Sequence, residues 1–101
     1  FLTDHHAIKL LVLEPGTRTS QQLHRVKLED LRLESGSAFV EFFVDGMATA
    51  VPLAGVPVVI KPLTVHRIVA GPSGAAILEI STPELSDVVR IEDDYGRGGD
   101  G

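Results

Sequence analysis

The feature that most constrains the fold of this chain is its series of short apolar runs, broken by glycine, proline, aspartate and serine. The strands that this pattern predicts cover residues 8–13, 20–24, 30–34, 38–44, 47–52, 56–61, 66–70 and 75–81. The apolar residues do not repeat at helical spacing over any long stretch. About eight or nine short strands, with turn signals every 8–12 residues or so, favour an all-β sandwich or barrel.

Several dipeptides predict where the chain reverses. Asp45 and Gly46 lie between two apolar runs, and Asp-Gly is a strong hairpin signal because both residues tolerate positive φ. Pro15 and Gly16 end the first run, and Ser35 and Gly36 predict another turn. A further turn is expected at residues 71–74, where two glycines flank Pro and Ser.

The chain has 101 residues, which allows a single domain with one modest core. We expect the barrel to occupy residues 1–95 and residues 96–101 to form a flexible tail, because four of those six residues are glycine. Cysteine is absent, so disulfides and thiolate metal sites are excluded. Any metal must therefore be held by nitrogen and oxygen ligands.

The charge balance excludes some partners. Nine basic and fourteen acidic residues give a net charge of −5, which argues against nucleic acid or an anionic membrane as the main partner. No apolar run approaches the roughly 20 residues of a membrane span. No export signal is visible, and we expect a cytoplasmic protein that acts on a small molecule.

Four side chains have the spacing of a metal site: Gln22, His24, Glu29 and His66. Residues 22 and 24 point to the same face of a strand, so both can approach one ion. Glu29 has the opposite parity and can join them only if the chain turns or bulges after His24. On spacing alone, ordinary strand histidines and a solvated glutamate are an equally good interpretation.

The same residues follow the first motif of the cupin family, and the chain resembles that family. Gly16, His24, Glu29 and Gly36 stand at the motif's intervals, with Gln22 in place of its first histidine. The second motif is matched more loosely, by Gly55, Pro62 and His66. The resemblance implies a single-domain cupin, a double-stranded β-helix or jelly-roll barrel.

A narrower resemblance is to the cupin domain of type II mannose-6-phosphate isomerases, which are bifunctional with mannose-1-phosphate guanylyltransferase. It rests on Ser20, Gln22, His24 and Glu29, on the stretch IKPLTVHR at residues 60–67, and on SDVVRIEDDYGR at residues 86–97. It implies a divalent metal, first of all Zn²⁺ and otherwise Mn²⁺, Fe²⁺, Co²⁺ or Ni²⁺. The implied ligands are Gln22, His24, Glu29 and His66.

The implied activity is isomerisation of a sugar phosphate through a metal-stabilised enediolate, with a base near the reacting carbon. Lys27 and Arg67 are the candidate catalytic cations, and Lys61 is a candidate substrate contact. The catalytic base could be any of Asp30, Glu41 and Glu79, which are candidates by elimination only.

Two other functions remain open: a metal-dependent cupin with dioxygenase or lyase chemistry, and a module that binds a sugar or a metal without turnover. Phe39, Phe42 and Phe43 lie in one expected strand and divide between its two faces. One set would fill the barrel and the other would cover a partner, so we expect a homodimer.

Overall fold

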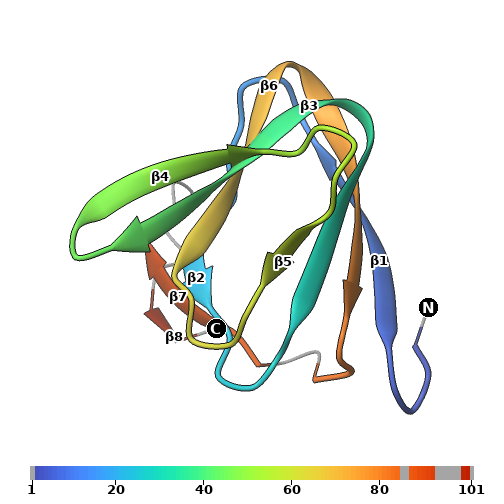
Figure 1. The fold of residues 1–101 in the computed structure, drawn as a ribbon, viewed down its shortest axis with the longest axis vertical. Coiled ribbons are helices and arrows are strands. Elements are labelled where there is room, and N and C mark those ends of the chain that lie inside the picture. Colours follow the sequence, from blue (N-terminus) through green and yellow to red (C-terminus); the bar gives the residue numbers. More distant parts are fainter. Residues whose placement is uncertain (1, 85–86, 93–98, 101) are drawn as a thin grey trace.

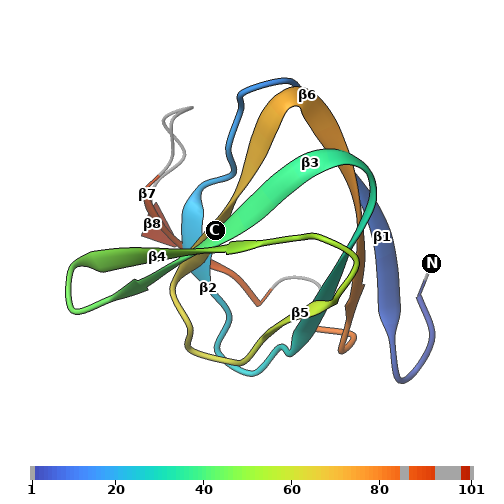
Figure 2. The same cartoon turned by 45° about the horizontal axis from the view of Figure 1, so that its top comes forward.

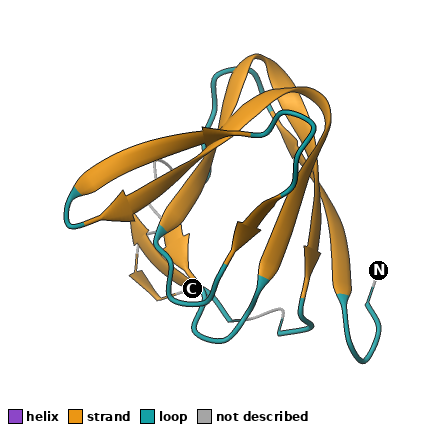
Figure 3. Ribbon diagram, viewed as in Figure 1, coloured by secondary structure: helices purple, strands orange, loops and turns teal. Residues whose placement is uncertain are grey.

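The computed structural model describes residues 2–84, 87–92 and 99–100, and these residues contain strands and no helix (Figures 1 and 3). The prediction of an all-β chain is confirmed. The eight strands are β1 (Ala7–Leu13), β2 (Gln21–Leu23), β3 (Glu29–Val44), β4 (Met47–Pro52), β5 (Val58–Ile60), β6 (His66–Ser81), β7 (Val89–Glu92) and β8 (Gly99–Asp100).

The domain limits stay a prediction. Of the expected tail at residues 96–101, only Gly99 and Asp100 lie among the described residues, where they pair with β7. Among the described residues, no helix is long and apolar enough to cross a membrane.

Two of the predicted turns are wrong. Residues 35–36 lie inside β3 and residues 71–74 lie inside β6, so each of these strands runs for 16 residues. Gly36 and Gly74 do adopt positive φ, at 79° and 78°. The register of the β3–β6 pair shifts on either side of Gly36. Bulges and positive-φ glycines bend a strand without reversing it, so the glycines mark corners of the barrel.

These bends let β3 and β6 contribute to two sheets. The first half of β3 pairs with β5 and with the second half of β6, which also pairs with β1. The second half of β3 pairs with β4 and with the first half of β6, which continues to β2, β7 and β8. Figures 1 and 2 show the two long strands folding over together at one end of the barrel.

Buried and more exposed side chains alternate along much of both long strands, and the buried ones include apolar as well as polar residues. The apolar core contains Leu31, Val40, Ile60 and Ile77, each at most 1% exposed. The buried polar residues gather in the same interior: Ser20, His24, Lys27, Glu29, His66, Glu79 and Ser81. A barrel that buries this many ionisable groups has a polar cavity next to its core.

The predicted hairpin at Asp45 and Gly46 is confirmed, with φ of 50° and 77°. It joins β3 to β4, and Figure 2 shows this pair projecting from the barrel. Phe42 packs against the core, whereas Phe43 lies under the guanidinium of Arg67, 5.3 Å from the ring centre.

Candidate metal centre

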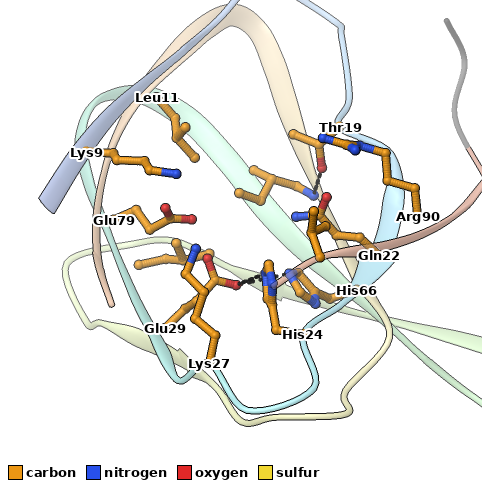
Figure 4. A pocket seen from close by; sticks show the side chains of 13 residues that line it. Lys9, Leu11, Thr19, Gln22, His24, Lys27, Glu29, His66, Glu79 and Arg90 are labelled. Atoms are coloured by element: carbon orange, nitrogen blue, oxygen red, sulfur yellow. Dashed lines mark hydrogen bonds and ion pairs between the residues drawn. The ribbon is translucent and has the colours of Figure 1, made fainter. Parts of the chain in front are cut away.

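A cavity of about 240 Å³ lies between the two sheets. Its lining contains all four predicted metal ligands together with Lys27 (Figure 4). The other lining residues are Lys9, Leu11, Thr19, Leu31, Ile68, Glu79, Val88 and Arg90. Residues from distant parts of the chain therefore meet in one pocket, as the spacing of the two motifs predicted.

The turn that the site required between His24 and Glu29 is present, and Asp87 holds it. The carboxylate of Asp87 accepts hydrogen bonds from the backbone N–H groups of Arg25, Val26 and Lys27, at 3.0, 2.8 and 2.9 Å. These bonds, that of Val26 first, together outweigh desolvation and lower the pKa of Asp87. The loop returns the chain into β3 with Glu29 facing the barrel interior.

Three ligand atoms converge at the base of the cavity. Nε2 of His24 lies 2.8 Å from Oε1 of Glu29, and Nε2 of His66 lies 3.5 Å from the same oxygen. One donor atom from each residue falls within 4.8 Å of the other two. Both histidines and the glutamate are at most 5% exposed.

The other ring nitrogen of each histidine fixes which nitrogen faces the cluster. Nδ1 of His66 donates to the carbonyl of Thr64 at 2.9 Å, and Nδ1 of His24 donates to the carbonyl of Asp87. A neutral imidazole with its proton on Nδ1 presents a lone pair at Nε2. In the neutral form, two lone pairs therefore point at a carboxylate oxygen, and Nε2 of His24 and Oε1 of Glu29 have no hydrogen-bond partner.

Such a cluster requires a positive charge, either a proton on a histidine or a metal ion. Burial lowers the pKa of His24, but the hydrogen bonds to Glu29 and to the Asp87 carbonyl outweigh burial, so the pKa is raised. Burial raises the pKa of Glu29, and its contacts with His24 and His66 reverse this and hold it well below its usual range. The carboxylate is therefore ionised and able to bind a cation.

The donor set suits a divalent transition metal. Ligand atoms about 2.0–2.2 Å from a tetrahedral zinc ion stand roughly 3.3–3.6 Å apart, which is close to the 3.5 Å between His66 and Glu29 and longer than the 2.8 Å between His24 and Glu29. Two imidazoles with a carboxylate also suit Mn²⁺, Fe²⁺, Co²⁺ and Ni²⁺. The hydrogen bonds to the Nδ1 atoms are of the kind that orients histidine ligands. His24, Glu29 and His66 therefore fit a metal ion.

Gln22 lies beside this cluster on β2, directly opposite His66 in the β2–β6 pair. Its Oε1 accepts a hydrogen bond from Oγ of Ser20 at 3.2 Å, which holds the amide in place. The amide thus lines the same cavity as the three converging ligand atoms. Whether it ligates a metal stays a prediction.

Glu79 is the second carboxyl group in the cavity. Burial is the main cause that raises its pKa to about 7, and its contact with the Glu29 carboxylate acts in the same direction. The other two candidates for a base lie elsewhere: Glu41 pairs with Arg67 at 2.6 Å, and Asp30 pairs with Arg32 at 3.2 Å. Of the three candidates, only Glu79 lines the cavity.

The predicted catalytic cation Arg67 and the predicted substrate contact Lys61 are not brought to this cavity. Arg67 follows His66 on β6, so its side chain leaves the opposite face of the strand and meets Glu41 and Phe43. Lys61 is exposed at the end of β5 and is not part of the lining. Lys27 does reach the cavity and is only 3% exposed.

Sequence reasoning missed three contributors: Lys9, Asp87 and Arg90. Lys9 is opposite Glu79 in the β1–β6 pair, so the two residues share a face of the sheet. Arg90 is opposite Gln22 in the β2–β7 pair. Asp87 and Arg90 stand inside the C-terminal stretch that carries the narrower resemblance, and that stretch was the available signal.

Together, the two sheets and their shared long strands define a double-stranded β-helix, the cupin fold, and the fold prediction is confirmed. A Klebsiella pneumoniae protein described as uncharacterized, with a double-stranded β-helix domain, superimposes with a TM-score of 0.72 at 20% identity, over 87% of this chain and 76% of that chain. No protein-family model and no curated protein sequence matches the chain.

Two further structures of this fold come from proteins of sugar chemistry. The capsular polysaccharide assembling protein CapF of Staphylococcus aureus matches with a TM-score of 0.76 at 16% identity, over 90% of this chain and 28% of CapF. The sugar 3,4-ketoisomerase QdtA of Thermoanaerobacterium thermosaccharolyticum, solved with TDP, matches with a TM-score of 0.73 at 15% identity, over 83% of this chain and 65% of QdtA. At these identities the likeness establishes the fold alone.

Proposed function

We propose that this chain is a metal-dependent isomerase of a small sugar phosphate, of the mannose-6-phosphate isomerase type. The observation that carries the proposal is the buried cluster of His24, Glu29 and His66, whose facing atoms all accept hydrogen bonds when both histidines are neutral, so that a cation can take the place of the missing proton. The sugar 3,4-ketoisomerase QdtA shares the fold, so isomerisation of a sugar, though not the use of a metal, is compatible with a barrel of this kind.

In this proposal His24, Glu29 and His66 hold the metal, with the amide of Gln22 as a fourth ligand. A bound divalent cation would supply Lewis-acid polarisation of a carbonyl group. Glu79 lines the cavity and is not one of these ligands, and in this proposal it would accept a proton from one carbon and return it to the next. Leu11, Leu31 and Ile68 line the same cavity and give it apolar walls that would limit the access of water to a bound substrate.

The test combines metal analysis with an assay. We expect the purified protein to bind about one equivalent of Zn²⁺, Mn²⁺, Co²⁺ or Ni²⁺ and to interconvert mannose 6-phosphate and fructose 6-phosphate. His66→Ala and Glu29→Gln should lose the metal and the activity. His6→Ala, which changes an exposed histidine, is the control and should keep both.

The outcomes separate the candidate functions. Metal binding without turnover of any aldose phosphate would remove the isomerase proposal. Oxygen consumption with Fe²⁺ or Mn²⁺ on a substrate panel would favour dioxygenase chemistry instead. Thermal stabilisation by a sugar without any product would favour a binding module.

We also propose that the chain forms a homodimer, and the support comes from the hairpin of β3 and β4. The three phenylalanines that suggested a partner are each partly buried in the single chain. The exposed apolar side chains of the hairpin are instead Val44 and Met47, at 65% and 74%. β4 carries no charged residue and lies at the edge of the sheet, so its backbone can pair with a second copy. Light scattering should give twice the chain mass, and Ala50→Lys should give the single mass.

A further inference from the structure

Three cationic side chains reach the cavity from separate parts of the chain. Lys9 comes from β1, Lys27 from the loop after β2, and Arg90 from β7. Figure 4 shows the amine of Lys9 and the guanidinium of Arg90 on the side of the cavity away from His24. Lys27 is 3% exposed, so its charge is almost wholly removed from water.

The charges of Lys9 and Lys27 act on the Glu79 carboxyl group, but these cations form no direct ion pair in the part of the chain that the structure describes. No ion pair or side-chain hydrogen bond joins Lys9, Lys27 or Arg90 to a described carboxylate. Glu29 is engaged by the two histidines, and Glu79 is opposite Lys9 without forming an ion pair with it. Lysine is rarely buried without a partner, because removing its charge from water costs roughly several kcal/mol.

The charges of the cavity therefore do not balance. Three lysine or arginine side chains line it against two carboxyl groups, and a divalent metal would add to the excess. The chain as a whole carries a net charge of −5. An excess of positive side chains on the cavity wall attracts anions, and the low-dielectric walls strengthen the effect.

We propose that Lys9, Lys27 and Arg90 form an oxyanion-binding subsite, which takes the phosphate or carboxylate group of a small substrate while the metal cluster takes its reacting end. The assignment rests on the proposed function and specifies how that site selects its substrate. Arginine presents two parallel N–H donors that match a phosphate or carboxylate, and the lysines add point charges.

The size of the cavity limits the substrate. At about 240 Å³ it is smaller than the roughly 300–1,000 Å³ of pockets that enclose drug-sized ligands. The subsite therefore fits a small anionic metabolite, such as a monosaccharide phosphate or a sugar acid. A nucleotide-linked sugar would not be enclosed.

The test measures binding to the metal-loaded protein by calorimetry, with mannose 6-phosphate, gluconate and uncharged mannose as probes. We expect at least one anion to bind about tenfold more tightly than mannose. Lys9→Gln and Arg90→Gln should each weaken the binding of that anion by about tenfold and leave the binding of mannose unchanged. Arg32→Gln is the control, because it removes an exposed positive charge outside the cavity.

The result identifies the anion and separates the two proposals. Preference for mannose 6-phosphate indicates a phosphate ester, and preference for gluconate indicates a carboxylate. Charge-dependent binding without turnover would keep the subsite and remove the isomerase. Equal binding of the three probes, no binding of either anion, or equal losses in Arg90→Gln and Arg32→Gln would overturn the subsite. Lys9→Gln keeps the test decisive if Arg90→Gln does not fold.

Discussion

The barrel interior has an apolar half around Val40 and Ile77 and an ionisable half around Glu29 and His66, and both halves are shielded from water. Val40 and Ile77 are 0% exposed, and Glu29 and His66 are 2% exposed. The apolar half needs no partners beyond close packing. With His24 neutral, the ionisable half leaves two atoms without hydrogen-bond partners, and its three cations have no ion-pair partner among the described residues.

This difference indicates what each half is for. Burying charged groups stabilises a fold less than filling the same volume with apolar side chains. A fold selected for stability alone would continue the apolar core to the end of the barrel. Residues that break this rule, at a cost in stability, are expected at functional sites.

The largest expected effect compares two residues on the same face of β6. Ile77→Ala removes a fully buried side chain and should lower the free energy of unfolding by about 2–5 kcal/mol while leaving metal affinity unchanged. Glu79→Gln, two residues away, should change the free energy of unfolding by less than about 1.5 kcal/mol and abolish the proposed isomerase activity. Urea denaturation and the sugar-phosphate assay measure the two effects. A greater loss of stability in Glu79→Gln would show that the ionisable half is structural.

The second comparison concerns the corner that closes the apolar half. Gly36 and Gly46 both have positive φ, at 79° and 77°. A Cβ on Gly36 would meet the carbonyl oxygen of Gly74 at 2.1 Å, whereas a Cβ on Gly46 would meet nothing within 4 Å. Gly46→Ala should therefore cost about 1–2 kcal/mol of stability for its backbone conformation. Gly36→Ala should cost roughly 1–3 kcal/mol more, because β3 and β6 must separate at their bend.

Equal thermal denaturation midpoints for Gly36→Ala and Gly46→Ala would contradict this account. They would mean that the long strands do not approach each other closely at the corner.

The smallest expected effect is a pH dependence that belongs to the ionisable half. The folded pKa of Glu79, about 7, lies above its ordinary value of 4.5. The folded protein therefore binds more protons than the unfolded chain between these values, so this contribution to stability declines as the pH rises through that range. The raised pKa of His24 acts in the same direction above its ordinary value of 6.5.

Metal-free protein should thus be less stable at pH 8 than at pH 5.5, as measured by urea denaturation. Glu79→Gln should flatten the profile, whereas Ile77→Ala should shift it down without changing its slope. A profile of Glu79→Gln that keeps the full slope would assign the dependence to other groups. The pKa values of Asp87 and Glu29 are lowered, so their contributions to stability change with pH only at more acidic values than these two conditions.

The sequence by itself determined the all-β class, the hairpin at Asp45 and Gly46, and the spacing that brings His24, Glu29 and His66 together. Strand alternation and turn chemistry are local, so they can be predicted from neighbouring residues. Only the tertiary structure decided that residues 35–36 and 71–74 bend their strands without ending them. A glycine is compatible both with a turn that ends a strand and with a bend inside one, and the pairing of β3 with β6 decides between the two.

The tertiary structure also decided which charges face the cavity. The pairing of β1 and β7 brought in Lys9 and Arg90, and the parity of β6 turned Arg67 outward. A side chain's direction follows from the register of its strand, and that register is set by partners more than 50 residues away, such as Lys9 and Glu79.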